Sequence, residues 1–415
     1  MHASDYVAVG VPSIMPVNIG DNRLIKEGIA QITETDAERL RRHRVKAGDI
    51  VYSRRGDVER RALVRISEVG WLCGTGCLLV RVSDGVADPV YASYYLGHPS
   101  VREWIVRHAV GAIMPNLNTE IMAAVPFALP PMPEQRAIAK VLGSLDDKID
   151  LNRRMNETLE AMAGALFRSW FVDFDPVRAK QEGRQPPGLD AATAALFPDS
   201  FADSPLGSIP TGWFVKPVFD VAELISGGTP STSNPKYWGG AISWASAKDV
   251  SQCGDAFLVT TERTITEAGL SNSSTKIVPA FTTVVVARGA TTGRFTMFSD
   301  DIGMNQTCYG LRSRDGLHFY FNCLFHDLVS ELVHAAHGSV FDTITTATFE
   351  RTRVAVPHAA IRQAFERRVE GLFKKVLANL HQAQTLSALR DALLPKLLSG
   401  EIRVKQADEI VESAR

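Results

Sequence analysis

PEQRAIAKVLGSLDDKIDLNRRMNETLEAMAGALFRSWFVDFD, residues 133–175, carries the most regular hydrophobic pattern of the chain. Alternating steps of four and three residues connect its buried-type side chains, which is the spacing of one helix packed along another. Pro133 and Glu134 suit a first helical turn. The pattern predicts a first spacer helix over 133–175, roughly 57 Å long across residues 134–171. Its ladder is Ile138, Leu142, Leu145, Ile149, Asn152, Asn156, Leu159, Ala163, Leu166 and Trp170.

A second ladder with the same steps follows 227 residues later and predicts a second spacer helix over 359–400. Pro395 should end or kink this helix, because proline cannot donate a hydrogen bond into the preceding turn. If the helices pair in antiparallel fashion, Asn152 and Asn379 lie near the midpoint, where their amides are predicted to bond each other and fix the register. The second ladder is Phe365, Val369, Leu372, Val376, Asn379, Ala383, Leu386, Arg390, Leu393 and Leu397.

The sequence ahead of each ladder is also repeated. Residues 48–56 match 281–289 at an offset of 233, and Cys77 matches Cys308 at an offset of 231. Gly10 to Ile14 resembles Gly240 to Trp244. The chain is therefore predicted to be a tandem duplication of one unit, a globular module followed by a long helix. The first copy lacks a counterpart of residues 211–239. Either the chain start is truncated or mis-assigned, or the missing strands come from elsewhere.

Composition is ordinary for a globular protein. The 415 residues have room for two or three domains, with 45% hydrophobic and 22% charged residues and a net charge of −1. No apolar run is long enough to span a membrane and no signal pattern is present, so we expect a cytoplasmic protein without a membrane partner. The five cysteines are scattered and lack histidines at zinc spacing, which favours free buried thiols over a metal site.

Strand-type runs and helical runs alternate in both copies, which predicts an α+β fold. Strands are expected at 49–53, 78–82, 213–218, 241–245, 277–287 and 307–312, and helices at 90–108 and 316–336. The predicted domains are 1–132 (first module, incomplete at its start), 133–175 (first spacer helix), 176–210 (linker), 211–358 (second module), 359–400 (second spacer helix) and 401–415 (tail). Prolines and glycines mark the linker, in which Leu189 to Phe197 suits two helical turns.

Four separated segments resemble the specificity subunits of type I restriction–modification systems. They are PPMPEQRAIAKVLGSLDDKI at 130–149, WFVDFDP at 170–176, ISGGTPS at 225–231 and LLPKLLSGEI at 393–402. The resemblance implies two target-recognition domains, mixed α/β with mainly antiparallel strands, separated by two antiparallel coiled-coil helices with pseudo-two-fold symmetry. It also implies double-stranded DNA, two methyltransferase (modification) subunits and restriction subunits as partners. Those subunits would hold S-adenosylmethionine, ATP and Mg, with no cofactor in this chain.

Motifs for catalysis are missing from the sequence. No Walker loop occurs, and Gly74-Thr75-Gly76 lacks the third glycine of a dinucleotide or S-adenosylmethionine loop. Asn234-Pro235-Lys236-Tyr237 only partly matches the Asn-Pro-Pro-Tyr motif of adenine methyltransferases. We therefore expect no catalytic residue and no metal in this chain. The Gly227 to Ser231 segment suits either a phosphate cradle or a plain hairpin loop.

Candidate DNA-binding side chains follow predicted strands. Arg54 and Arg55 in one copy and Arg288 in the other precede a glycine at a strand end, where arginine can bond guanine or phosphate. Weaker candidates in the second module are Lys248, Arg263, Lys276 and Arg294. Residues 39–65 hold ten Arg or Lys against three acidic residues, a net of +7. This run suits either a solvated surface or a patch that faces phosphates.

Three functions fit these observations. The first is a non-catalytic subunit that reads a bipartite asymmetric DNA site, with the helices setting the spacing. The second is a competent enzyme such as a fused methyltransferase, which the missing cofactor motifs disfavour. The third is a coiled-coil protein–protein scaffold without DNA readout.

Overall fold

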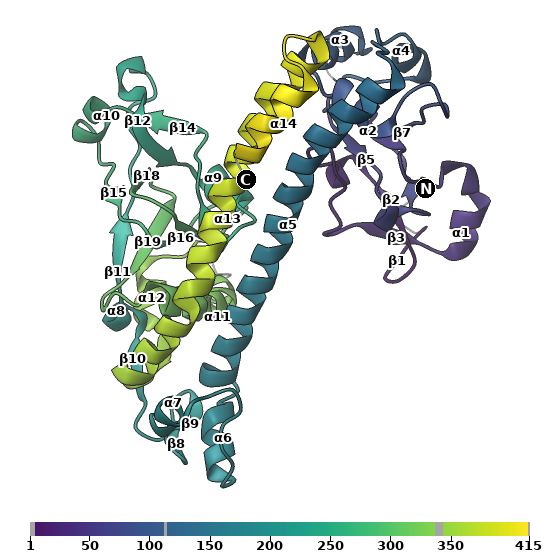
Figure 1. Cartoon of the computed structure of the whole chain (residues 1–415). Coiled ribbons are helices and arrows are strands. Elements are labelled where there is room, and N and C mark those ends of the chain that lie inside the picture. Colours follow the sequence, from purple (N-terminus) through teal and green to yellow (C-terminus); the bar gives the residue numbers. More distant parts are fainter. Residues whose placement is uncertain (1–4, 112–113, 337–342, 414–415) are drawn as a thin grey trace. The chain divides into compact units, whose positions relative to one another are not determined.

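The computed structural model describes residues 5–111, 114–336 and 343–413 (Figure 1). Its longest elements are the helices α5 (Met132–Phe171) and α13 (Ala359–Ser399). The chain divides into two units, Met1–Asp150 with Gln384–Arg415 and Leu151–Ala383. Each long helix therefore contributes one part to each unit. Across the described ranges, no helix combines the length and apolarity that a membrane crossing requires.

The first unit contains two small sheets. One has the order β1-β3-β2-β6 and the other has the order β5-β4-β7. The strands are β1 (Tyr6–Val7), β2 (Val11–Ile14), β3 (Ala30–Ile32), β4 (Ile50–Ser53), β5 (Arg61–Leu63), β6 (Leu72–Cys73) and β7 (Cys77–Val80), and the helices are α1 (Glu34–Arg39), α2 (Pro89–Tyr95), α3 (Pro99–His108), α4 (Thr119–Ala123) and α14 (Val404–Ser413). An apolar cluster joins α2, both long helices and α14.

The second unit has a five-stranded sheet, β11-β19-β16-β17-β13, and a four-stranded sheet, β14-β12-β18-β15. Two antiparallel pairs, β8 with β9 and β10 with β20, complete its strands. The bounds are β8 (Phe201–Ser204), β9 (Gly207–Pro210), β10 (Phe214–Pro217), β11 (Ala222–Ser226), β12 (Trp238–Ala245), β13 (Phe257–Leu258), β14 (Arg263–Ile265), β15 (Ile277–Val278), β16 (Thr283–Val286), β17 (Phe295–Phe298), β18 (Ile302–Met304), β19 (Cys308–Ser313) and β20 (Arg353–Val356). Its helices, besides the parts of α5 and α13, are α6 (Asp175–Gln181), α7 (Ala191–Ala195), α8 (Val218–Val221), α9 (Ala247–Gln252), α10 (Glu267–Ser271), α11 (His318–Ala336) and α12 (Thr346–Arg351).

Strand register confirms the predicted duplication. In the first unit β4 pairs with β7 so that Ser53 lies opposite Cys77. In the second unit β16 pairs with β19 so that Val286 lies opposite Cys308. These pairs differ by the two offsets read from the sequence, 233 and 231. The two modules are therefore copies of one mixed α/β unit with mainly antiparallel pairing, and the predicted fold class is correct.

One predicted equivalence is wrong by a single residue. Ser13 lies opposite Leu72 in the parallel pair of β2 and β6, and Trp244 lies opposite Gly303 in the parallel pair of β12 and β18. Leu72 and Gly303 are equivalent at the offset of 231. Their partners are therefore equivalent too, which matches Ser13, not Ile14, to Trp244. A slip of one residue would turn every side chain of the strand to the other face, so the register decides the match.

The second unit has strands that the first one lacks. Among the described residues, β7 has a strand on one side only, whereas its counterpart β19 pairs with β16 on one side and β11 on the other. No described strand of the first unit corresponds to β10 or β11. The structure thus agrees with the missing counterpart of residues 211–239.

Several predicted boundaries are wrong. The helix expected over 90–108 is two helices, because Pro99 begins a new first turn in α3. The strand expected over 277–287 is split into β15 and β16, and Phe281 between them has a positive φ of 63°. Helix α5 ends at Phe171, and Phe174 with a φ of 56° leads into α6.

Pro395 does not end α13, which continues to Ser399. Leu393, Leu394 and Leu397 are buried in the apolar cluster of the first unit, and this packing offsets the hydrogen bond that the proline removes. The predicted tail, 401–415, includes α14, whose Ala407 and Val411 are buried.

The predicted linker, 176–210, is packed rather than extended. Val177, Leu189, Phe197 and Ile209 belong to the main apolar cluster of the second unit. Trp170 of α5 packs edge-on against Phe197, with ring centroids 5.1 Å apart. The prolines and glycines therefore separate short elements, α6, α7 and the β8–β9 hairpin, and the predicted turns at Leu189 to Phe197 include α7.

Candidate nucleic-acid interface

Each unit has a hairpin loop that follows the central strand of a sheet and carries arginines near its start and at its end. In the first unit the loop spans 54–60, and the Ser53 amide donates to the Arg60 carbonyl oxygen at 3.0 Å. In the second unit it spans 287–294, and the Val286 amide donates to the Arg294 carbonyl oxygen at 2.8 Å. Ser53 and Val286 are equivalent by register, so Arg60 and Arg294 are equivalent too. We call these the arginine loops.

Arg55 and Arg288 occupy the same position in the two arginine loops. Each forms an isolated antiparallel bridge, Arg55 with Asn116 and Arg288 with Thr343. Each precedes a glycine in the left-handed region, Gly56 at φ 77° and Gly289 at φ 102°. Both side chains are exposed. Within the described ranges no ion pair or side-chain hydrogen bond engages either guanidinium, so both are available to a ligand.

Arg54 differs from its neighbour. Its Nε donates to the Leu117 carbonyl oxygen at 3.2 Å, and its counterpart in the second unit is the buried Ala287. The backbones around Arg54 and Ala287 make the same bonds, to Gly76 and Leu117 in one unit and to Thr307 and Ile344 in the other. The two modules therefore share a framework and differ in a side chain at the base of the loop.

The other candidate side chains differ in whether their charged group already has a partner within the protein. The Lys248 ammonium donates to Glu262 at 2.7 Å, and this hydrogen bond raises the pKa of Lys248. Arg294 is exposed and has no side-chain partner among the described residues. Arg60, which sequence reasoning did not single out, pairs with Asp57 at 2.9 Å. The match of Arg60 to Arg294 at an offset of 234 is the signal that could have identified it.

Half of the ten basic residues at 39–65 form ion pairs, Arg60 among them. Arg39 pairs with Asp36 at 2.9 Å, Arg41 with Glu38 at 3.4 Å, Arg44 with Glu34 and Arg65 with Asp147 at 3.6 Å. Arg61 is buried and donates to the Ser93 carbonyl oxygen at 2.7 Å. These contacts favour the solvated-surface interpretation for the paired residues, and a patch that faces phosphates stays a prediction for the others.

The glycine motif at 227–231 is explained by close packing. A Cβ on Gly227 would lie 2.0 Å from the Asn305 carbonyl oxygen, and one on Gly228 would lie 2.3 Å from the Ser274 carbonyl carbon. The Gly228 amide donates to Met304 at 2.8 Å, and its carbonyl oxygen accepts from Trp244 Nε1 at 3.1 Å. These contacts leave the Gly228 amide committed to the protein, so the phosphate-cradle interpretation is not supported at this residue.

The helix pair has a polar centre within the second unit. Asn379 Nδ2 donates to Asn156 Oδ1 at 2.8 Å, and Asn152 Nδ2 donates to Gln382 Oε1 at 2.9 Å and to the Asn379 carbonyl oxygen at 3.4 Å. All three asparagines are buried. Asn152 and Asn379 are therefore in contact as predicted, but through the Asn379 backbone, because the Asn379 side chain reaches one turn further along α5 to Asn156.

The predicted seam residues are buried or partly buried in both units. Antiparallel pairing is evident in the second unit, where Asn156 contacts Val376 and Trp170 packs on Phe365. The buried seam residues are Ile138, Leu142, Leu145, Asn152, Phe365, Val369, Val376, Asn379 and Leu386, and the partly buried ones are Ile149, Leu159 and Leu372.

Thiol and metal chemistry have little support in the described part of the chain. All five cysteines are free, and burial raises the pKa of the Cys73 thiol to about 12. A thiol in this state is a poor nucleophile and a poor metal ligand at neutral pH. No group of three or more His, Cys, Asp or Glu side chains in the described ranges is placed to hold a metal ion.

Two repeated mixed α/β modules, each with an arginine loop and each followed by a long helix, define a class of internally duplicated proteins. The family model for the type I restriction modification DNA specificity domain matches residues 12–161 and 210–380. The chain belongs to this family, and the two matched segments correspond to the two repeats, each with part of its long helix.

Known relatives extend over nearly the whole chain. The specificity subunit of the type I restriction enzyme HindI from Haemophilus influenzae is 26% identical, over 94% of this chain and 95% of the relative. The specificity subunit of the type I restriction enzyme MjaIX from Methanocaldococcus jannaschii is 24% identical, over 97% of this chain and 89% of the relative. The crystal structure of a type I S subunit from M. genitalium is similar with a TM-score of 0.54 at 14% identity, covering 96% of this chain and 91% of that one. That likeness supports the fold.

Proposed function

We propose that this chain reads a bipartite, asymmetric DNA site and carries no chemistry of its own. The observation that supports this most is the pair of equivalent arginine loops, one in each unit, at the ends of strands with the same register. Arginine at such a position can donate two hydrogen bonds to guanine O6 and N7 or contact phosphate. Because the two loops differ in sequence, the two half-sites should differ too.

The helix pair supplies the spacing in this proposal. The 40-residue helix α5 is roughly 60 Å long, whereas one turn of DNA is roughly 34–36 Å. Two modules held by such helices can read grooves about one turn apart and leave the bases between them unread. Target identity would then depend on the modules, and spacer length on the helices.

Methylation and cleavage would come from partner subunits. Specificity subunits of type I systems are non-catalytic as a family, and this chain belongs to that family. We propose two modification subunits that hold S-adenosylmethionine and restriction subunits that use ATP and Mg. The protein would work in the cytoplasm, where these partners and the DNA are found.

Co-expression with the modification subunits and mapping of methylated adenines across the host genome tests the proposal. Methylation should occur at one bipartite asymmetric sequence, and the purified chain alone should methylate nothing. Arg288→Ala should weaken discrimination at one half-site by roughly 1–3 kcal/mol, and Arg55→Ala at the other. Arg184→Ala, which changes an exposed arginine outside both loops, is the matched control.

One result would make the Arg288→Ala test uninformative, and another would contradict the proposal. Equal loss at both half-sites in Arg288→Ala would indicate a folding defect rather than lost readout. A chain that joins its partners but shows no salt-dependent binding to DNA would favour a protein–protein scaffold.

A further inference from the structure

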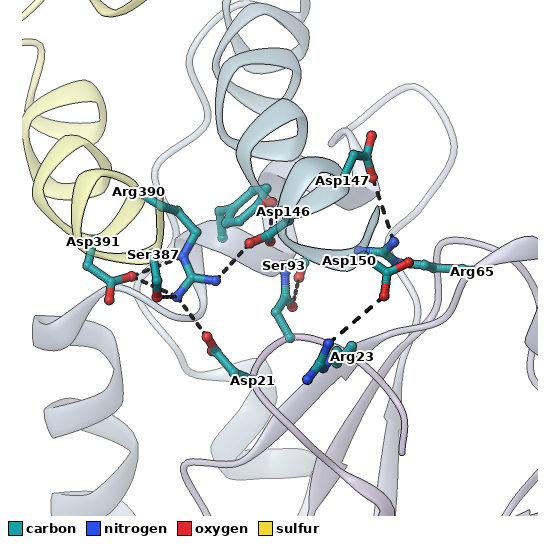
Figure 2. A network of polar contacts seen from close by, with 12 residues as sticks. Asp21, Arg23, Arg65, Ser93, Asp146, Asp147, Asp150, Ser387, Arg390 and Asp391 are labelled. Atoms are coloured by element: carbon teal, nitrogen blue, oxygen red, sulfur yellow. Dashed lines mark hydrogen bonds and ion pairs between the residues drawn. The ribbon is translucent and has the colours of Figure 1, made fainter. Parts of the chain in front are cut away.

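Arg390 of α13 binds carboxylates from three different segments of the first unit. Its Nη1 donates to Asp146 of α5 at 2.7 Å, and its Nη2 donates to Asp21, which lies between β2 and β3, also at 2.7 Å. Asp391 on the same helix accepts from Nη2 at 2.8 Å, and Ser387 accepts at 3.3 Å. Figure 2 shows these carboxylates arranged around one guanidinium.

The centre of this network is buried and charged. The side chains of Arg390 and Asp146 are 10% and 11% exposed, and Tyr94 of α2 donates to the second oxygen of Asp146 at 2.5 Å. Burial alone would lower the pKa of Arg390, but the carboxylates of Asp146, Asp21 and Asp391 outweigh it and raise that pKa. A buried charge pair is stable only with such a full set of partners.

Asp21 is one of three consecutive residues whose side chains contact other segments of the first unit. Asn22 accepts a hydrogen bond from Ser93 of α2, and Arg23 pairs with Asp150 of α5 at 3.9 Å. Asn22 also forms a bridge with Ala62, and its carbonyl oxygen accepts from the Leu63 amide at 3.4 Å. Ala62 and Leu63 lie in β5, the strand that directly follows the arginine loop at 54–60.

The described residues of the second unit contain no equivalent of this network. At the offset of 227, Arg390 corresponds to Ala163 and Asp146 corresponds to Phe373. Both are buried in the main apolar cluster, and Phe373 stacks on Phe319 with ring centroids 4.9 Å apart. The second module is thus held to its helices by apolar packing at the place where the first is held by ion pairs.

We propose that Arg390 is a positioning residue that holds the first arginine loop at a set place on its helices. The contact runs from Arg390 to Asp21 and then through Asn22 to β5. The consequence for DNA rests on the function proposed above, namely that this loop reads one half-site. Loss of the Arg390–Asp21 contact should widen the range of spacer lengths that are accepted. The bases read at the second half-site should stay unchanged.

Hydrogen–deuterium exchange of the full-length chain without DNA tests the Arg390–Asp21 contact itself. Asp21→Asn changes a side chain that is 65% exposed, so it weakens the contact without burying a lone charge. It should speed exchange at residues 19–25 and 54–62, and Arg390→Gln should do so more strongly. Arg390→Lys, which keeps the charge but cannot bridge both carboxylates in the same way, should fall between. Asp391→Asn is the matched control, because Asp391 contacts the same guanidinium from its own helix.

Methylation by the assembled complex tests the consequence. Substrates would carry both half-sites with the optimal spacer or with one base pair more or less. Asp21→Asn should reduce the preference for the optimal spacer by roughly fivefold, and Asp391→Asn should not. Wild-type exchange and spacer preference in Asp21→Asn, or equal effects of Asp391→Asn, would overturn the inference. A wild-type complex that ignored spacer length would instead refute the proposed function. The exchange data would still show whether the Arg390–Asp21 contact positions the first arginine loop.

Discussion

Glu160 of α5 should make the second unit less stable as the pH rises. The residue is half-buried, and its pKa is raised from 4.5 to about 7. The main cause is burial, followed by the negative charge of Asp255, while a hydrogen bond from the Ala256 amide lowers it and Glu157 adds a small repulsion. The folded state therefore holds the proton more tightly than the unfolded state.

The size of the effect follows from linkage. Because the folded-state pKa lies above the unfolded one, stability is highest below about pH 4.5, falls between 4.5 and 7, and changes no further above 7. Each pKa unit corresponds to about 1.4 kcal/mol, so the whole loss is about 3 kcal/mol at most. Glu160→Gln removes the titrating group and should recover that amount at pH 8 while changing little at pH 4.5.

Urea unfolding at pH 5 and pH 8, followed by tryptophan fluorescence, measures this directly. Four of the six tryptophans, Trp170, Trp213, Trp238 and Trp244, lie in the second unit and report on it. Glu157→Gln is the control, because Glu157 is an exposed neighbour paired with Arg153 and should shift stability by less than about 0.5 kcal/mol. An unchanged pH dependence in Glu160→Gln would refute the reasoning.

Replacing Asn152 and Asn379 with leucine leaves the buried Asn156 Oδ1 without its donor, so the double variant should lose about 1–3 kcal/mol in urea unfolding, whereas adding Asn156→Leu should restore or exceed wild-type stability. A double variant as stable as the triple one would argue against the observed Asn379–Asn156 bond. Phe197→Ala should cost about 3–5 kcal/mol in the same assay if residues 176–210 are core, and a cost below about 0.5 kcal/mol would mean that the segment is a linker.

Much of the fold was predictable from period and repetition. The four–three ladder is a local property of helices, and the constant offset of 227 links two helices that are far apart in sequence. The structure places both ladders on long helices and repeats the strand register in the two modules. The family resemblance, carried by four motifs, added the class of partners.

The polar contacts could not be predicted in the same way. Spacing placed Asn152 and Asn379 near the midpoint of the helix pair. It could not predict the partner of each side-chain amide, because the amide can reach residues one helical turn away. Arg390 was the single charged member of the second ladder, a signal that a buried partner was needed, yet Asp21 is far away in sequence. Pro395 does not end α13, because packing of the surrounding leucines offsets one lost hydrogen bond, and the predicted kink stays a prediction.

The arginines illustrate a further limit. The sequence placed Arg55 and Arg288 correctly at strand ends, because a strand followed by glycine is a local signal. It could not separate them from Lys248, which is neutralised by Glu262, or from the paired arginines of 39–65, because each of those partners depends on the folded chain.

Insertion of one heptad into both long helices, next to Asn152 and Asn379, tests the central claim most directly. Seven residues keep the seam in phase and lengthen each helix by roughly 10 Å, which at about 3.4 Å per base pair corresponds to about three base pairs. Mapping of methylated sites with the modification subunits present should find both half-sites unchanged and the spacer longer by up to about three base pairs. Altered half-site bases, or the original spacer retained, would contradict the account.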